Sequence, residues 1–380
     1  MAHEPAAQAW SRVRRDLHAH PELAFEERRT SRLVASHLQR LGLAVSEGIG
    51  KTGVVATLRK GRSTQSVGLR ADMDALPVTE SNRFDHCSQT PGCMHACGHD
   101  GHVAMLLGAA EALAGTEFDG TIHFIFQPAE EGAGGAAAMI ADGLFERFPM
   151  HSIFGLHNWP GLEAGAFAVH TGPIMAGTDH FGISVEGRGA HAAMPHLGKD
   201  PLIAGASLVQ NLQTIVSRNV APLDPAVLSV TGFHSGTATN VIPDAAELYG
   251  TIRFFSERTR SLMRGGIERM CRAMAEVFNV NIETDWHEGY PPTINSAPEA
   301  RLAAQAARAA GHDRAVLSDM APSMGAEDFA YYLEKKPGAY VWIGNGNGAG
   351  LHSPEYDFND EIIPTGIRFW TETALRALSA

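Results

Sequence analysis

The segment MHACGHDGH at residues 94–102 gathers side chains that could bind a metal ion. Cys97, His99, Asp100 and His102 stand here among small residues. Thiolate, imidazole and carboxylate groups bind zinc and its transition-metal neighbours. The next residues, HVAMLLGAAEALA, have the spacing of an amphipathic helix, so the cluster would occupy the turn that enters this helix. A redox or structural cysteine beside solvent-exposed histidines is the alternative interpretation of this segment alone.

Two adjacent carboxylates, Glu130 and Glu131, directly follow the β-type run TIHFIFQP. Neighbouring residues at a strand end point in different directions, so one carboxylate could bind a metal while the other faces a substrate. Metal-assisted hydrolysis needs such a pair, because one group fixes the ion and the other takes a proton from water. Two solvated acids in a loop would be the simpler interpretation if the pair stood alone.

Two further histidines follow apolar segments. His157 lies in GLHNWP after an apolar strand, and His352 lies in LHSPEYDF after a Gly-rich loop. A lone histidine in such a place is more often structural than a ligand, so the argument is collective. Four separate segments together offer five ligand-type side chains, which suits two metal ions better than one. These five are Cys97, His99, Glu131, His157 and His352.

Other catalytic motifs are absent from the sequence. The string GIGKTG at residues 48–53 matches the GxGxxG pattern, but β-type GVVATL follows it where a dinucleotide site needs a helix. The sequence contains no GxSxG nucleophile elbow and no HExxH zinc motif.

The elements around these residues alternate between helices and strands. We expect helices over residues 6–18 and 30–40, the second with Thr30 as N-cap, and strands at GVVATLRK, SVGLRAD and TIHFIF. This alternation predicts an α/β domain with a mixed, mostly parallel sheet covered by helices on both faces. Ligands collect at the carboxyl ends of such strands, where Asp72 and Asp74, the glutamate pair and His157 all fall.

The pattern changes after Gly172. Strand-like DHFGISVEG, PAVLSVTGFH, AAELYGTIRFF and NVNIETDW alternate with helical runs at about 200–218 and 257–278. The order β-α-β-β-α-β is that of a ferredoxin-like α+β domain, here inserted as a satellite. The prediction is therefore a discontinuous metal-binding domain over residues 1–176 and 292–380, and a satellite domain for lid or dimer formation over 177–291.

Composition limits the class of protein. The 380 residues carry a net charge of −12, which argues against nucleic acid or an anionic membrane as the main partner. Four cysteines are too few for a disulfide scaffold, so a reducing compartment fits better. We find no signal-peptide core and no apolar run of membrane-spanning length, and we expect a cytoplasmic protein.

Nine motifs spread over nearly the whole chain can now be taken together. They resemble the M20 family of metallopeptidases, specifically its aminoacylase-like branch, which includes hippurate hydrolases, N-acyl-amino-acid amidohydrolases and auxin-conjugate hydrolases. No single motif would be specific, but the set is. The motifs are LHAHPELAFEE, GLRADMDALP, MHACGHDGH, FQPAEEGAGGA, GLHNWP, GRGAHAAMPHLGKDP, TATNVIPDAAELYGTIR, MGAEDFAYY and LHSPEYDFND.

The resemblance assigns roles to individual residues. It implies metal binding by the five ligand-type side chains named above, and it makes Glu130 the general base. Asp72 stands where other branches of the family have a metal-binding histidine, so Asp72 and Asp74 are expected to orient the ligands. The satellite domain would supply His191 as a donor to the oxyanion, in its own subunit or across a dimer interface. Asn240 and Arg253 would grip the substrate carboxylate, with a sheet-edge ion pair as the alternative for Arg253.

The function implied is hydrolysis of the amide bond of an N-acyl amino acid by two divalent ions per subunit, most simply manganese or zinc, with nickel or cobalt possible. A homodimer or homotetramer through the satellite domain, and closure of the two domains, fit the same picture. Three alternatives stay open: a dipeptidase or carboxypeptidase of the same family, a non-catalytic metal- or ligand-binding protein on this scaffold, and a thiol enzyme with Cys97 as nucleophile.

Overall fold

The structure is a computed structural model that describes residues 6–311 and 313–379. The chain forms two compact units. The larger takes in the residues up to 174, residues 294–321 and the residues from 328 onward, and the smaller takes in 175–293 and 322–327. Each unit has its own hydrophobic core, and each is described here by itself.

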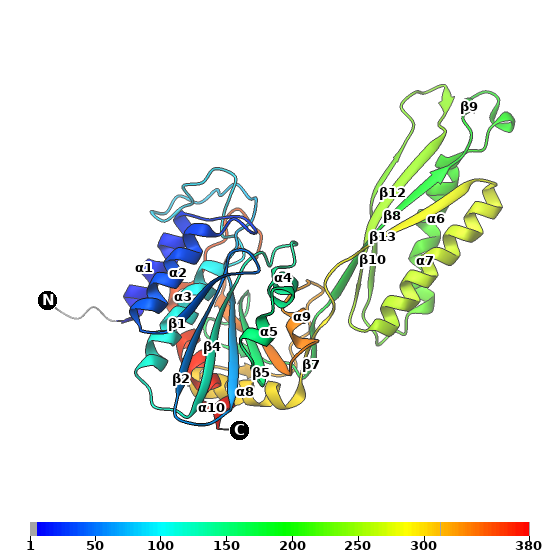
Figure 1. Ribbon diagram of the computed structural model, residues 1–380. Coiled ribbons are helices and arrows are strands. Elements are labelled where there is room, and N and C mark those ends of the chain that lie inside the picture. Colours follow the sequence, from blue (N-terminus) through cyan, green and yellow to red (C-terminus); the bar gives the residue numbers. More distant parts are fainter. Residues whose placement is uncertain (1–5, 312, 380) are drawn as a thin grey trace. The chain divides into compact units, whose positions relative to one another are not determined.

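The larger unit is built on an eight-stranded mixed sheet, in the order β1-β2-β4-β3-β5-β16-β6-β15 (Figure 1). The inner strands β4, β3, β5 and β16 run parallel to one another, while β2 and β6 pair antiparallel with them. The predicted mixed, mostly parallel sheet is confirmed. The strands are β1 (Ala44–Ile49), β2 (Gly53–Lys60), β3 (Ser66–Asp72), β4 (Gly120–Gln127), β5 (Ser152–Pro160), β6 (Phe167–Ala168), β15 (Val316–Leu317) and β16 (Gly338–Gly346).

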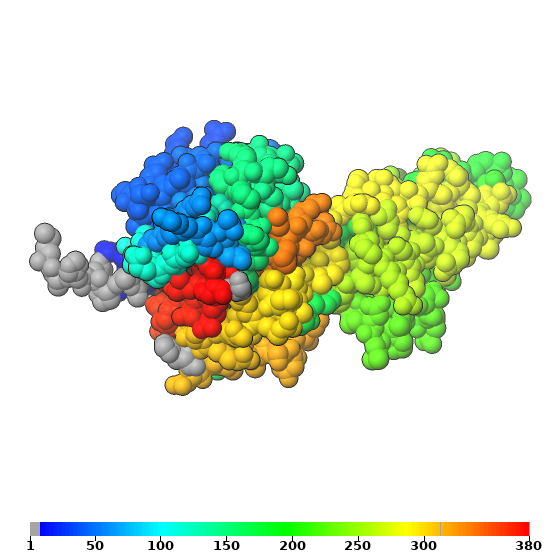
Figure 2. Space-filling view, turned by 60° about the horizontal axis from the view of Figure 1, so that its bottom comes forward, coloured from blue at the N-terminus to red at the C-terminus, as the bar shows by residue number. Residues whose placement is uncertain are grey.

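Long helices pack on one face of this sheet, and α3 and α10 both contact β3. In the space-filling view, α8 (yellow-orange) and α10 (red) lie side by side at the surface of this unit (Figure 2). The helices are α1 (Ala6–Ala19), α2 (Arg28–Arg40), α3 (His99–Ala114), α8 (Ala297–Gly311) and α10 (Ile363–Leu378), with the shorter α4 (Gly135–Ala141), α5 (Leu144–Arg147), α9 (Ala330–Leu333) and 3-10 turn Asp360–Ile362.

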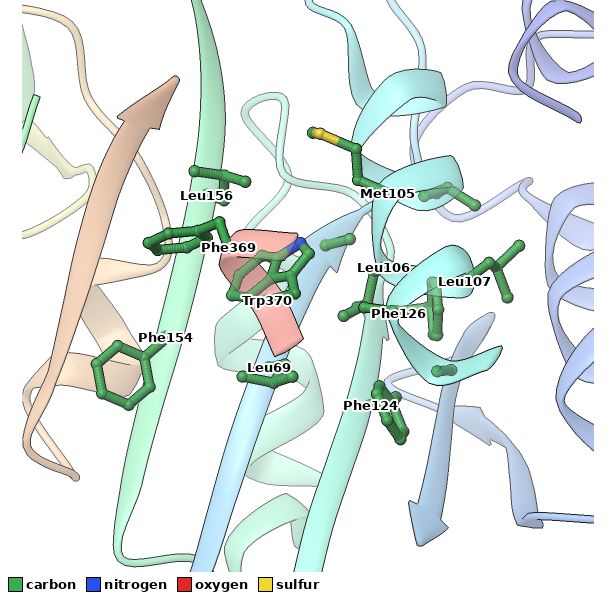
Figure 3. Close-up of a cluster of buried hydrophobic side chains, with 14 of the residues drawn as sticks. Leu69, Met105, Leu106, Leu107, Phe124, Phe126, Phe154, Leu156, Phe369 and Trp370 are labelled. Atoms are coloured by element: carbon green, nitrogen blue, oxygen red, sulfur yellow. The ribbon is translucent and has the colours of Figure 1, made fainter. Parts of the chain in front are cut away.

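Helix α3 is not amphipathic, contrary to the prediction. Its residues are buried without a break from His99 to Ala110. The reason is its central position, because α3 packs against the sheet and also against α1, α2 and α10. Figure 3 shows Leu106 and Leu107 of α3 in one cluster with Phe124 and Phe126 of β4. A helix that is buried from His99 to Ala110 holds its first turn rigidly, which matters for the residues that begin it.

The start of α2 also differs from the prediction, since the helix begins at Arg28 and Thr30 is buried inside its first turn. The carboxylate of Glu22 replaces the expected cap. It accepts hydrogen bonds from the backbone N–H groups of Arg29 (2.9 Å) and Thr30 (2.8 Å). A side chain from outside the helix therefore satisfies the free N–H groups of the first turn.

The smaller unit is a four-stranded antiparallel sheet, in the order β10-β12-β8-β13, with two helices. Burial alternates along β8 and β12, as expected for a sheet covered on one face. The chain order β8, α6, β10, β12, α7, β13 confirms the ferredoxin-like prediction. The elements are β8 (Gly177–Glu186), α6 (Pro201–Thr214), a π-turn (Ile215–Asn219), β10 (Val227–Ser235), β12 (Ala245–Phe254), α7 (Glu257–Phe278) and β13 (Asn281–Glu288).

Short strands complete the fold. β9 (Ala190–His191) pairs with β11 (Val241–Ile242), and β7 (Gly172–Met175) pairs with β14 (Thr293–Asn295). A 3-10 turn at Pro195–Leu197 follows β9 along the chain. Residues 48–53 lead directly into β2, so a strand follows this segment as the sequence predicts. None of the described helices is both long enough and apolar enough to cross a membrane.

Candidate metal centre

The five predicted ligands lie together in the larger unit, although more than 250 positions separate the first from the last. Among the described residues, five groups of three can offer ligand atoms within 4.8 Å of one another, and two of these groups consist only of predicted ligands. Both groups contain Cys97, so its sulfur stands between two candidate metal positions. The groups are Cys97, His99 and His157, and Cys97, Glu131 and His352.

Four separate segments deliver these side chains. Cys97 precedes α3, and His99 is the first residue of that helix. Glu131 follows β4, and His352 follows β16 with a left-handed φ of 63°. Such a φ is costly for a non-glycine residue and is often found at functional sites. His157 lies inside β5, which continues to Pro160, so the prediction that the strand ends before it was wrong.

Ligand atoms of these side chains face one another. Sγ of Cys97 lies 3.4 Å from Nε2 of His157, and Nε2 of His352 lies 3.2 Å from Oε1 of Glu131. Nε2 of His99 lies 4.0 Å from the same oxygen. Nε2 of His99 and Oε1 of Glu131 are buried and have no hydrogen-bond partner. Buried polar atoms are normally satisfied, so this donor set fits a pair of cations.

Electrostatics supports the same interpretation. Burial, followed by the charges of Glu131 and Glu130, raises the pKa of the Cys97 thiol well above its usual range. Burial, together with the neighbouring His102, holds the pKa of His157 well below its usual value, so this imidazole is neutral. Neutral imidazole is the metal-binding form, and a cation is what would turn the thiol into a thiolate ligand.

Asp74 connects two of the ligand segments. Its backbone oxygen accepts a hydrogen bond from Nδ1 of His99 (2.8 Å), which leaves Nε2 of that ring free to bind a metal. Its Oδ2 accepts the backbone N–H of Glu131 (2.9 Å). This is the orienting position that the sequence predicts for Asp74, and its role stays a proposal.

Asp72 contacts other side chains at the same centre. Oδ1 accepts from Nδ1 of His102 (2.6 Å), and Oδ2 accepts from Nη1 of Arg70 (2.6 Å). Nε2 of His102 in turn accepts the backbone N–H of Asn158 (3.0 Å). Both ring nitrogens of His102 are therefore occupied, which explains why this histidine of the 94–102 segment is not free to bind a metal.

The fourth member of that segment, Asp100, is also turned away from the ligands. Its Oδ2 lies 2.9 Å from Nδ1 of His18, and both side chains are fully buried. Burial opposes protonation of His18, but its hydrogen bonds to Asp100 and Glu80 outweigh this and raise its pKa to about 9. Sequence analysis missed His18, because LHAHPE has no spacing that links it to residue 100.

Glu130 is buried beside the ligands but belongs to neither group that contains Cys97. Its Oε1 accepts the backbone N–H of Asp328 (3.4 Å). The Asp328 carboxylate is itself fixed by Nη2 of Arg70 (3.0 Å) and Nε2 of Gln127 (2.8 Å). These three supporting residues were also missed, although MGAEDFAYY, which contains Asp328, is one of the motifs.

Gly98 allows the turn between the first two ligands. Its φ of +90° lies in the left-handed region, and a Cβ atom there would stand 2.3 Å from Nδ2 of Asn158 and 2.4 Å from the hydroxyl of Tyr356. Nδ2 of Asn158 donates to the carbonyl of Cys97 (2.6 Å), and Tyr356 donates to Oδ1 of Asn158 (2.6 Å). Only glycine fits here, and the contacts fix the Cys97 backbone.

The three predicted residues of the satellite domain lie in the smaller unit and are not all close together. His191 is exposed on β9, and the N–H of Ala192 donates to the carbonyl of Asn240 (3.0 Å), so His191 and Asn240 are neighbours. Arg253 lies on β12, eight residues beyond Ala245, where that strand begins. Eight extended residues span about 27 Å, so Arg253 lies at the opposite end of the sheet from His191 and Asn240.

The alternative of a sheet-edge ion pair for Arg253 is wrong. β12 is an inner strand, with Arg253 between Thr178 of β8 and Val227 of β10. Across the described parts of the chain, no acidic side chain forms an ion pair with Arg253, and burial lowers its pKa. An inner-strand arginine without an acidic partner is available for an anionic ligand.

Known proteins resemble this chain over nearly its full length. A model of peptidase family M20/M25/M40 matches residues 68–376. A hippurate hydrolase of Campylobacter jejuni is 40% identical over 369 residues, covering 97% of this chain and 96% of the relative. An N-acetyl-L-cysteine deacetylase of Bacillus subtilis is 38% identical, covering 97% and 88%. Thermostable carboxypeptidase 1 of Saccharolobus solfataricus is 38% identical, covering 93% and 91%.

A solved structure shares the fold. The YXEP protein of Bacillus subtilis, described as a dinuclear metal-binding peptidase of the M20 family, superposes with a TM-score of 0.86 at 34% identity. The match covers 98% of this chain and 99% of that one. The chain therefore belongs to peptidase family M20/M25/M40, and the family prediction from the motifs is confirmed.

Proposed function

We propose that this protein is a metal-dependent amidohydrolase that cleaves the amide bond of N-acyl amino acids and releases a carboxylic acid and a free amino acid. The observation that carries the proposal is the pair of ligand groups sharing Cys97, with the separate carboxylate of Glu130 beside them. Family membership and the relatives that act as hippurate hydrolase and N-acetyl-L-cysteine deacetylase support the reaction class.

Two divalent ions fit the donor set. One would be held by Cys97, His99 and His157, the other by Cys97, Glu131 and His352. When bound, such ions lower the pKa of water and polarise the acyl oxygen of the substrate. We propose zinc or manganese, because the thiolate is a soft ligand that suits zinc and the carboxylate also accepts manganese, with nickel and cobalt as further candidates.

Glu130 acts as the general base. It is buried, and the N–H of Asp328 orients one of its oxygens, so its carboxylate has a fixed direction. In the reaction Glu130 takes the proton from the attacking water and later delivers it to the leaving amine. Asp72 and Asp74 keep the neighbouring histidines and Glu131 in place through the hydrogen bonds described above.

Two copies of the chain supply the substrate-binding residues. In this proposal His191 donates to the oxyanion, while Asn240 and Arg253 bind the substrate carboxylate. One copy of the smaller unit cannot place all three on one small substrate, because Arg253 lies at the other end of β12. A homodimer or homotetramer through the satellite domain, residues 177–291, would combine Arg253 of one copy with His191 and Asn240 of the other.

Trp159 is positioned to bind the acyl group. It lies two residues after His157 on β5, so both side chains leave the same face of the strand. The rings of Trp159 and His157 are 6.4 Å apart, and Trp159 stacks on the buried ring of Trp342 at 3.9 Å. A half-buried, rigid aromatic surface next to the ligands favours an aromatic acyl group such as benzoyl.

Glu130→Gln tests the proposal. The variant should keep both metal ions and lose roughly 10²–10⁴-fold in the rate of N-benzoyl- and N-acetyl-amino-acid hydrolysis, the usual range for a missing general base. Glu111→Gln, an exposed acid on α3, is the matched control and should behave as wild type. A Glu130→Gln enzyme with full turnover would remove Glu130 from this role.

The three alternatives give different results in the same assays. A dipeptidase or carboxypeptidase, the class named for one of the relatives, would prefer unblocked dipeptides or longer peptides to acyl amino acids. A binding protein would hold metal without hydrolysis of any substrate tested. A thiol enzyme would resist chelators, but the raised pKa of Cys97 makes this thiol a poor nucleophile at neutral pH.

A further inference from the structure

A hollow lies at the opposite end of the large sheet from the metal centre. Its volume is about 680 Å³, and its lining includes the start of β3 at Ser66, Thr121 near the start of β4, and the residues before β5 and β16. The metal ligands come from the other ends of these strands, since β4 leads to Glu131 and β5 contains His157. The length of β3, about 20 Å, separates the two sites.

Cations line this hollow, which we call the basic hollow. Arg59 of β2 and the consecutive Lys335 and Lys336 contribute three positive charges. No aspartate or glutamate is among the lining residues, all of which lie in the described part of the chain. The nearby Asp119 does not line the hollow, and its Oδ1 accepts the backbone N–H groups of Arg62 and Ser63 (both 2.6 Å).

These cations have no protein anion among the described residues to neutralise them. In residues 6–311 and 313–379, none of Arg59, Lys335 and Lys336 forms an ion pair. The ammonium of Lys336 lies 5.6 Å from the centre of the Phe145 ring. An arginine fork and a lysine at the rim of a concave site are the groups that bind phosphate and carboxylate.

Hydroxyl groups also line the basic hollow, but two of their protons are used within the protein. Thr57, Thr121 and Ser66 line it from three adjacent strands. Thr57 donates its hydroxyl proton to Nδ1 of His123 (2.9 Å), because Nε2 of that ring donates to the carbonyl of Pro149 (3.2 Å). Ser66 donates to Nδ1 of His151 (2.9 Å), which also accepts the backbone N–H of Ser66 (3.2 Å). The cations are therefore the groups of the basic hollow that would bind an anion.

We propose that the basic hollow binds a small organic or inorganic anion that carries at least two phosphate or carboxylate groups. Its volume lies within the range of small-molecule sites, roughly 300–1,000 Å³, and exceeds what a single phosphate fills. The site is separate from the metal centre and does not depend on the proposed hydrolysis.

Calorimetry on the full-length, metal-loaded protein tests the proposal, with pyrophosphate and citrate as probes at constant ionic strength. Both probes can also bind metal ions, so the variants decide the outcome. The double variant Arg59→Gln/Lys335→Gln should bind the tighter of the two probes with an affinity at least about tenfold lower, because two charge-assisted hydrogen bonds are lost. Arg32→Gln/Arg40→Gln removes the same charge from exposed positions of α2 and should leave the affinity unchanged.

Comparison of the two probes distinguishes a phosphate ligand from a carboxylate ligand. Thermal unfolding without anion should be equal in the two double variants, which shows that both are folded, and acyl-amino-acid hydrolysis should stay at the wild-type rate. Equal affinity of the Arg59→Gln/Lys335→Gln variant and wild type for both probes would overturn the proposal. Equal weakening in the control variant would also overturn it, because the effect would then come from net charge alone.

Discussion

Sγ of Cys97 lies 3.4 Å from Nε2 of His157, with both side chains buried, and the same sulfur belongs to the group formed by Glu131 and His352. Because both groups need this sulfur, Cys97→Ala should bind neither ion tightly. His352→Ala removes a ligand from one group only and should retain about one ion per chain. Elemental analysis after gel filtration measures the bound metal.

Cys87→Ala is the matched control for this experiment, because Cys87 is a free cysteine outside both ligand groups. It should bind as much metal as wild type. A Cys97→Ala protein that still carried two ions per chain would show that the sulfur does not join the two positions.

The buried pair of His18 and Asp100 predicts a dependence of stability on pH. The pKa of His18 is about 9 in the folded chain and near 6.5 in the unfolded chain. Folding therefore favours the protonated ring, and this contribution is complete below about pH 6.5 and disappears as the pH rises through 9. At 1.36 kcal/mol per unit, its upper value is on the order of 3 kcal/mol.

Chemical denaturation of wild type and His18→Gln between pH 6 and 10 measures this contribution. The difference in unfolding free energy between the two proteins should be largest near pH 6 and should shrink steadily above pH 7. A difference that is constant over this range would mean that His18 contributes by packing or neutral hydrogen bonds, without a change in charge.

The separation of His191 from Arg253 along β12 predicts complementation between variants. His191→Ala and Arg253→Ala should each lose most activity alone. After mixing and subunit exchange in a two-fold symmetric dimer, half of the dimers are mixed, and each has one intact site of two. Activity should therefore recover to roughly a quarter of wild type. Mixing without any recovery would place all the groups of a site in one copy.

Much of this architecture could be predicted from local sequence. Strands β3 and β4 are apolar runs that end at polar residues, and the residue types of Cys97 and His99 already indicate a metal. The convergence of ligands followed from the rule that strand ends share one edge of a sheet.

Long-range contacts explain what the sequence could not show. His99 and His102 are of the same type and only three positions apart, yet the N–H of Asn158 and the carboxylate of Asp72 occupy both nitrogens of His102. The burial of α3 depends on α1 and α10, which come from opposite ends of the chain. Neither fact is encoded in a window of neighbouring residues.

The stack of Trp159 on Trp342 predicts a preference for aromatic acyl groups. Trp159→Ala removes the half-buried ring of the pair while leaving the buried Trp342 and the His157 ligand in place. An aromatic pair contributes about 0.5–1.5 kcal/mol, so kcat/KM for N-benzoyl substrates should fall by roughly two- to thirteenfold, mainly through KM. N-acetyl substrates of the same amino acid have no ring to stack and should change little. Steady-state kinetics on both substrates decides the matter, because an equal loss on both would mean that Trp159 supports His157 and does not contact the acyl group.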